Sequence, residues 1–194
     1  MNIGNGIRRC AGVLAAIGLL GLLGFAGDNA VAQMQPEMQP MRAVVSIADQ
    51  KMDVYVGDKR IAQWTVSTSS PLNTDCTEGG IPGGRPVVCE TPIGTFHPTF
   101  VKERAFSKKW QSWMYYPVFF DWTGDAIHGT DEVAELGHPA SHGCVRLLPE
   151  NAKIFHDLVV ERRRANAFPG VTITILPDAT QERRIPLAAY RLQI

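Results

Sequence analysis

The sequence has no excess of charge of either sign, because its 194 residues include 19 Lys and Arg and 19 Asp and Glu. Proteins that bind nucleic acid are usually basic, so nucleic acid is not a predicted partner. The four cysteines are too few and too scattered for a disulfide-dense scaffold or a zinc ribbon. Hydrophobic residues at 45% and charged residues at 20% are ordinary for a folded protein, which excludes disorder as the main state.

No apolar run in the sequence reaches the roughly 20 residues that a membrane-spanning helix needs. The longest run, residues 11–26, follows the basic pair Arg8-Arg9. The triplet Ala30-Val31-Ala32 comes soon afterwards and has the small-x-small pattern that signal peptidase requires. We therefore predict a signal peptide at residues 1–32 and export of the mature chain. An uncleaved N-terminal anchor is the alternative.

Export changes the interpretation of the few cysteines, because exposed thiols tend to pair in an oxidising compartment. Cys76 and Cys89 flank the Gly- and Pro-rich segment TEGGIPGGRPVV. A bridge between them would close a loop of about 14 residues and stabilise the fold by roughly 3 kcal/mol. We predict this disulfide, with two independent thiols as the alternative. Cys144 is then a leftover cysteine that needs a functional explanation.

The remaining pattern is that of one domain with mostly β-strands. Residues 33–42 form a polar linker rich in Met and Pro, and β-type patterning begins at residue 43. Gly57-Asp58 predicts a hairpin turn, and residues 171–176 a last strand. Pro149 and the apolar residues that follow it at helical spacing predict a helix: Ile154, Phe155, Leu158 and Val159. We predict a mainly β domain at 43–177 with one or two short helices, and a C-terminal tail at 178–194.

Residues suited to nucleophilic chemistry are concentrated in HGT at 128–130 and SHGCVR at 141–146. A cysteine nucleophile needs a base that removes its proton, and histidine is the natural partner. His142 shares one short backbone segment with Cys144, so their tips seldom converge, whereas His128 arrives on another segment. We therefore predict Cys144 as the nucleophile and His128 as the general base that lowers its pKa. Gly143 permits a tight turn and close approach of a substrate carbonyl to backbone N–H groups.

Zinc is an alternative explanation for these side chains. The potential ligands are His128, His138, His142 and Cys144. Catalytic zinc usually takes three well-spaced ligands together with an acid/base carboxylate, and the chain has neither C-x-x-C nor H-E-x-x-H. We therefore predict no metal and no cofactor.

The two segments resemble the L,D-transpeptidase catalytic domain family, also called YkuD-like. The family pattern is a His-Gly pair, then Ser/Thr-His-Gly-Cys, a hydrophobic residue and Arg or Asn, which this chain matches at His128-Gly129 and at 141–146. The segment TPIGTF at 91–96 is also typical of the family. The resemblance covers residues 43–177. It implies β-sandwich or barrel-like sheets, and acyl transfer on peptidoglycan stem peptides outside the cytoplasm.

The resemblance also implies supporting roles around the two catalytic residues. The Gly129 carbonyl orients the imidazole, and the amides of Gly143 and Cys144 are candidates for an oxyanion hole. Arg146 holds a substrate carboxylate or braces the loop. The other two motif residues line the site and fix its loop: His142 and Ser141. The loop between Cys76 and Cys89 is not part of the general family pattern.

We therefore predict an exported cysteine L,D-transpeptidase that takes a tetrapeptide stem as acyl donor, forms a thioester on Cys144 and releases D-alanine. An amine of a second stem, or of an outer-membrane protein, then resolves the thioester. The alternatives are an L,D-carboxypeptidase or amidase that uses the same cysteine, and a non-catalytic wall-binding module. Arg146 in place of Asn resembles Gram-negative members and indicates the periplasm.

Overall fold

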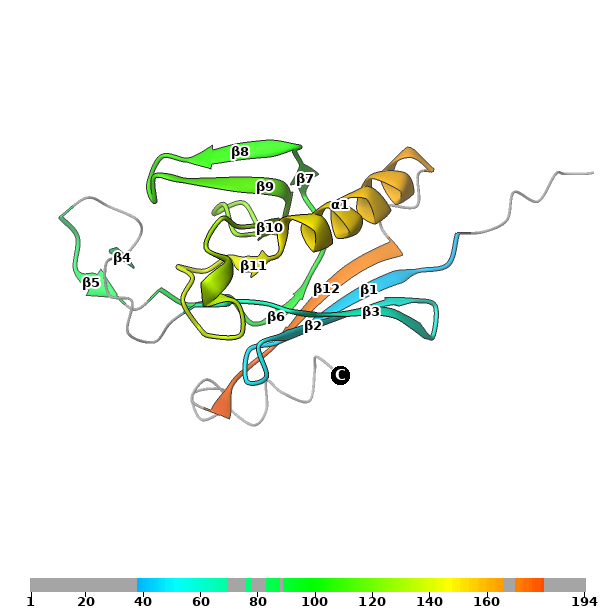
Figure 1. Cartoon of the computed structure of the whole chain (residues 1–194), viewed down its shortest axis with the longest axis horizontal. Helices are drawn as coiled ribbons and strands as arrows, with labels where there is room; N and C mark the ends of the chain where they lie inside the picture. The colour runs from blue at the N-terminus through cyan, green and yellow to red at the C-terminus, as the bar shows by residue number, and fades with distance from the viewer. Residues whose placement is uncertain (1–37, 70–75, 78–82, 88, 166–169, 180–194) are drawn as a thin grey trace, which may run out of the picture. The chain divides into compact units, whose positions relative to one another are not determined.

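Two five-stranded β-sheets form the framework of the described chain (Figure 1). The computed structural model describes residues 38–69, 76–77, 83–87, 89–165 and 170–179. The first sheet has the order β3-β2-β1-β12-β6, and β1 and β12 pair in parallel while its other pairs are antiparallel. Its strands are Met41–Ser46 (β1), Lys51–Val56 (β2), Lys59–Thr65 (β3), Gly94–Phe96 (β6) and Val171–Leu176 (β12).

The second sheet has the order β11-β10-β9-β7, and β8 also pairs with β9. Its strands are Phe100–Val101 (β7), Arg104–Ser107 (β8), Ser112–Phe119 (β9), Ala126–Gly129 (β10) and Val145–Leu147 (β11). β10 and β11 are parallel, so the chain between them must cross over. This connection contains the short 3-10 helix η2, Val133–Glu135. A separate two-stranded pair joins Cys76–Thr77 (β4) to Pro86–Val87 (β5).

The core is formed by side chains from both sheets. Met41, Ala43 and Val45 on β1 are completely buried and alternate with more exposed residues, as expected for a strand with one covered face. The same core cluster includes residues of the neighbouring strands and of the second sheet: Met52, Val54, Val118, Ile127, Val145, Leu147 and Ile173. This packing fixes the position of β10, which carries His128, and of β11, which begins directly after Cys144.

Helix α1, Pro149–Arg164, directly follows β11 and packs on β9 and β10. Proline fits its first turn because that turn has no internal partner for an N–H group. The helix predicted after Pro149 is thus confirmed, but its buried face is rotated from the predicted one. Ile154 is 51% exposed, and the buried stripe contains Ala152, Phe155 and Val159.

The mainly β fold predicted from the sequence is confirmed. Gly57 has a φ of +56° in the turn between β2 and β3, where the hairpin was predicted. The first strand begins at Met41, two residues before the predicted start. The predicted signal peptide at 1–32 lies outside the described residues, as do 180–194 of the predicted tail. In the described part of the chain, no helix is both long and apolar enough to cross a membrane.

Candidate active site

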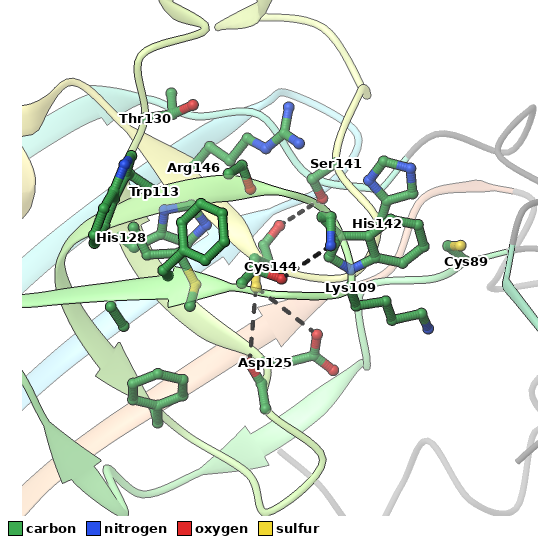
Figure 2. A pocket seen from close by; sticks show the side chains of 18 of the residues that line it. Cys89, Lys109, Trp113, Asp125, His128, Thr130, Ser141, His142, Cys144 and Arg146 are labelled. Carbon is green, nitrogen blue, oxygen red and sulfur yellow. Dashed lines mark hydrogen bonds between the residues drawn. The ribbon is translucent and has the colours of Figure 1, made fainter. Parts of the chain in front are cut away.

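The parallel pairing of β10 and β11 brings the two predicted catalytic residues to one cavity. The register aligns Ile127 with Val145 and His128 with Arg146. Cys144 directly precedes β11, two residues before Arg146. His128, Cys144 and Arg146 line the same cavity of about 1130 Å³, and Figure 2 shows how they lie in it. The crossover connection therefore joins residues that are far apart in the sequence.

The loop that carries Cys144 is held by hydrogen bonds to its own serine and to a neighbouring segment. Ser141 Oγ donates to the Cys144 carbonyl at 2.6 Å, and the Gly143 N–H donates to the same Oγ at 3.3 Å. The backbone N–H groups of Ala140 and Ser141 both donate to the Thr68 carbonyl, at 2.9 and 2.7 Å. Ser141 is fully buried, so its place is inside the loop, where it orders the backbone around Cys144.

Gly143 occupies a position that other residues do not tolerate. Its φ is +138°, a backbone conformation that residues with a Cβ rarely adopt. A Cβ at this position would lie 2.5 Å from Asp125 Oδ1. The glycine therefore serves two purposes, because it allows the turn of the loop and leaves room for the Asp125 carboxylate.

His128 is held in one orientation by the next residue. Its Nδ1–H donates to the Gly129 carbonyl at 2.8 Å, and since a carbonyl can only accept, Nδ1 carries the hydrogen. In the neutral ring Nε2 then holds the lone pair. Burial, together with the nearby Arg146 guanidinium, lowers the pKa of His128 to about 4. At neutral pH the imidazole is therefore uncharged and can accept a proton.

The Cys144 thiol faces the turn that precedes β10. Its Sγ lies 4.0 Å from the Gly124 carbonyl oxygen and 4.0 Å from Asp125 Oδ1, as Figure 2 shows. Burial, followed by the charge of Asp125, raises the pKa of the Cys144 thiol to about 12. The sequence predicts a lowered pKa; in the structure the direction is opposite, first because the sulfur is buried and second because a carboxylate outside the motif lies beside it. The resting residue is thus a neutral thiol that must lose its proton as it attacks.

Asp125 is the site residue that sequence reasoning missed. It ends the turn between β9 and β10, where Asp121 Oδ1 accepts the N–H groups of Thr123, Gly124 and Asp125 at 3.1, 2.9 and 2.9 Å. Burial and the Asp121 charge raise the pKa of Asp125 to about 7. The Asp-Trp-Thr-Gly-Asp sequence signals a turn. Nothing in it shows that this turn lies against Cys144.

His142 is stacked on an aromatic side chain from the connection between β8 and β9. The ring centroids of His142 and Trp110 are 3.8 Å apart, with an angle of 18° between the planes. Lys109 Nζ lies 4.5 Å from the centroid of the Trp110 ring. All three residues line the cavity, so the stack fixes the plane of the His142 imidazole at the wall of the site.

Residues 40–174 of the sequence match the L,D-transpeptidase catalytic domain family, YkuD. The chain belongs to this family. The matched region contains β10, the crossover connection and the loop with Cys144, so the family assignment includes the whole cavity lining described above. No curated protein matches this sequence.

Solved L,D-transpeptidases share the fold of this chain. An L,D-transpeptidase from Mycobacterium smegmatis aligns at 18% identity with a TM-score of 0.55, over 72% of this chain and 59% of that one. The enzyme LdtMt1 in complex with imipenem aligns at 20% identity and a TM-score of 0.56, over 71% and 59%. An L,D-transpeptidase from Stackebrandtia nassauensis aligns at 22% identity with a TM-score of 0.53, over 78% of this chain and 62% of that one. The chain described here spans about three fifths of the length of these structures.

In this chain the side chain of Arg146 is buried and paired with Glu132, which follows β10 on the crossover connection. Backbone hydrogen bonds in both directions also join Arg146 to Ser67, at 3.0 and 2.8 Å. The Glu132 side chain is half exposed at the cavity. Arg146 is thus braced from two sides, and its guanidinium lies close enough to lower the pKa values of both His128 and Cys144.

Cys76 and Cys89 form a disulfide, with Cα atoms 5.5 Å apart. Both residues line the same cavity as Cys144, although they come from a different part of the chain. Cys144 is the free cysteine among the described residues. The disulfide therefore fixes one wall of the cavity and leaves a single thiol inside it.

The ligand cluster that the zinc alternative requires is not present in the part of the chain that the structure describes. No three His, Cys, Asp or Glu side chains are gathered there in an arrangement that could hold a metal ion. His138 lies on the crossover connection, where its carbonyl accepts a hydrogen bond from Ser67 Oγ at 2.7 Å. It does not line the cavity with the other two histidines.

Proposed function

We propose that this protein is an exported cysteine L,D-transpeptidase that acts on peptidoglycan tetrapeptide stems. Cys144 attacks the carbonyl of the third stem residue, diaminopimelate, and the terminal D-alanine leaves. The observation that carries this proposal is the shared cavity of Cys144 and His128, in which Gly129 fixes the tautomer of the imidazole. Membership of the L,D-transpeptidase family supports the same chemistry.

His128 supplies the acid–base chemistry of the first half-reaction. Nε2 takes the thiol proton as Cys144 attacks, and returns it to the amine of the departing D-alanine. The lowered pKa of His128 supports the second of these steps, because a histidinium formed in a buried site gives up its proton readily. The Gly129 carbonyl keeps its hydrogen bond to Nδ1 throughout, so the ring does not rotate away.

The negative charge that develops on the attacked carbonyl oxygen needs N–H donors. The amides of Gly143 and Cys144 lie in the loop at the nucleophile, and Gly143 has the positive φ, +138°, that turns this loop. The Gly143 N–H bonds to Ser141 Oγ at the long distance of 3.3 Å, so it can exchange this partner for a substrate oxygen. His142 and Arg146 line the surrounding wall and contact the substrate there.

The thioester is then resolved by an amine of a second stem or of an outer-membrane protein. Water gives an L,D-carboxypeptidase from the same acyl-enzyme. The predicted signal peptide at 1–32 and the Arg in the family motif support the periplasm as the place of action.

The deciding experiment is incubation of the mature protein with purified disaccharide-tetrapeptide, with products identified by mass spectrometry. We expect loss of D-alanine and formation of a cross-linked dimer. Tripeptide alone would assign the carboxypeptidase reaction, and a muropeptide linked to added envelope protein would assign protein attachment. Cys144→Ala is the matched control and should yield none of these products. Release of D-alanine by Cys144→Ala would contradict the cysteine mechanism.

A carbapenem tests the nucleophile without any peptidoglycan substrate. One solved L,D-transpeptidase of this fold is a complex with imipenem. We expect imipenem to add its mass once to this protein and not to Cys144→Ala. An unchanged intact mass after prolonged exposure would contradict Cys144 as the acylated residue.

A further inference from the structure

A carboxylate outside the family motif lies against the proposed nucleophile. Asp125 Oδ1 is 4.0 Å from Cys144 Sγ, and Figure 2 shows the two side chains pointing toward each other. Its other oxygen accepts a hydrogen bond from Thr123 Oγ1 at 3.4 Å. Asp121 folds the turn through three backbone hydrogen bonds, so the position of Asp125 is set by its own local structure. Asp125 also lines the cavity in which substrate would bind.

This carboxylate opposes the first half-reaction. Its negative charge raises the pKa of the Cys144 thiol, so it makes the thiolate harder to form. It is also partly buried beside a second acid, Asp121, which destabilises its charged form. Asp125 therefore hinders formation of the thiolate and is itself unfavourable in its charged form. Both effects are consistent with a role in the second half-reaction, when the sulfur is already acylated.

The nucleophile of the second half-reaction is an amine, and this amine is protonated in water. An alkylammonium must therefore be attracted to the thioester and must lose a proton there. A carboxylate beside the acylated sulfur does both, because it attracts the cation and then accepts its proton. On the basis of the proposed transpeptidase function, we propose that Asp125 binds the ammonium group of the acyl acceptor beside the Cys144 thioester and takes up one of its protons.

The proposed step conserves atoms and charge. The ammonium gives one proton to the Asp125 carboxylate, and the resulting neutral amine attacks the thioester carbonyl. The C–N bond forms and the C–S bond breaks, while the second proton passes through His128 to the departing Cys144 sulfur. The products are the new amide, the Cys144 thiol and a protonated Asp125, which then releases its proton to water. The raised pKa of Asp125, about 7, suits a group that gains and loses a proton at neutral pH.

The charge around Asp125 favours a cationic acceptor. The charged groups that face the carboxylate are Asp121 from its own turn and Lys109 from the connection between β8 and β9. Lys109 is engaged with the Trp110 ring, 4.5 Å from its centroid, and its effect on the pKa of Asp125 is the smallest of those that act. An ammonium arriving in the cavity therefore meets a carboxylate next to the reacting sulfur.

The test compares Asp125→Asn with the natural protein in both half-reactions. The donor is disaccharide-tetrapeptide, and the acceptor is either a second stem, which carries an ammonium, or hydroxylamine, which is uncharged at neutral pH. All rates are normalised to the Cys144 that imipenem titrates, so that incorrectly folded protein does not count. Asp53→Asn removes the same charge from β2, away from the cavity, and is the matched control.

We expect Asp125→Asn to lower transfer to the ammonium acceptor by about 10- to 100-fold relative to transfer to hydroxylamine. Acylation by imipenem should be faster, because the charge that raises the thiol pKa is gone. If the ratio of transfer to the ammonium acceptor and transfer to hydroxylamine is the same in Asp125→Asn and in the natural protein, the proposal for Asp125 is overturned. Release of D-alanine in that experiment would still support the transpeptidase function. A natural protein that never releases D-alanine would overturn both.

Discussion

The Nδ1–H of His128 donates to the carbonyl of its own neighbour, Gly129, at 2.8 Å. This bond uses the one ring nitrogen that faces the backbone and leaves Nε2 as the basic atom. The Gly129 carbonyl thus orients the histidine as the carboxylate does in a Ser-His-Asp triad. The difference is that a neutral carbonyl does not hold the imidazolium as strongly, so the proton is passed on more easily.

Replacement of His128 by Ala should slow acylation of Cys144 by a factor of about 10²–10⁴, because the proton acceptor is lost. His142→Ala should slow it less, since His142 stacks on Trp110 at the wall of the site and is not the proposed proton acceptor. The measurement is the rate of imipenem addition by intact mass. Added imidazole should restore part of the rate in His128→Ala and none in His142→Ala. The reverse pattern would assign the base to His142.

Gly143→Ala should slow acylation of Cys144 strongly while leaving the protein folded. The strained φ costs about 1–3 kcal/mol, and the new methyl would displace either the Asp125 carboxylate or the loop. A displacement of this kind next to the nucleophile should lower the acylation rate by about 100-fold. Gly83→Ala is a suitable comparison, since Gly83 also has a positive φ, +78°, but no atom within 4 Å of its Cβ position. Similar rates for the two variants would show that crowding at Gly143 is unimportant.

The double variant Cys76→Ser, Cys89→Ser should lower the free energy of unfolding by about 2–4 kcal/mol. The bond joins residues 13 apart and therefore restricts a short loop of the unfolded chain. Both sulfurs also line the cavity, so the variant should acylate with imipenem more slowly at the same temperature. Urea unfolding of the oxidised protein, the reduced protein and the variant checks the first effect. If all three unfold at the same urea concentration, the disulfide has no stabilising role.

The sequence allowed prediction of the features that depend on local pattern. The helix after Pro149 and the strand at 171–176 follow from spacing and from the position of proline, and the motif segments contain His128 and Cys144. The two residues line one cavity because β10 and β11 are parallel neighbours. A one-dimensional pattern does not specify that pairing.

The rest of the site depends on tertiary contacts that no spacing rule encodes. Asp125 reaches Cys144 only because the Asp121 side chain folds a turn against a loop that begins more than ten residues later. Burial of the sulfur, together with this contact, raises the thiol pKa, which is opposite to the direction predicted from the sequence. Trp110 reaches His142 from the connection between β8 and β9, and β8 had no sequence signal of its own.

Asp125→Asn should stabilise the fold in a pH-dependent manner. Burial and the Asp121 charge raise the pKa of Asp125 from 3.8 to about 7, so the folded protein holds this proton more tightly than the unfolded chain does. A raised folded-state pKa gives stability that is fully present below pH 4 and is lost as the pH rises through about 7. Above that pH the ionised carboxylate destabilises the natural protein. Asn keeps the shape without the charge.

The expected gain for Asp125→Asn is on the order of 1–3 kcal/mol at pH 8 and close to zero at pH 4. Thermal unfolding of the two proteins side by side measures it. His128, whose lowered pKa gives the opposite slope between about pH 4 and 6.5, is present in both proteins and cancels from the difference. Asp53→Asn controls for the loss of one charge and should show no such rise with pH. A gain that is equal at pH 4 and pH 8 would mean that Asp125 carries no perturbed proton, and its proposed part in taking a proton from the acceptor would then lose its electrostatic basis.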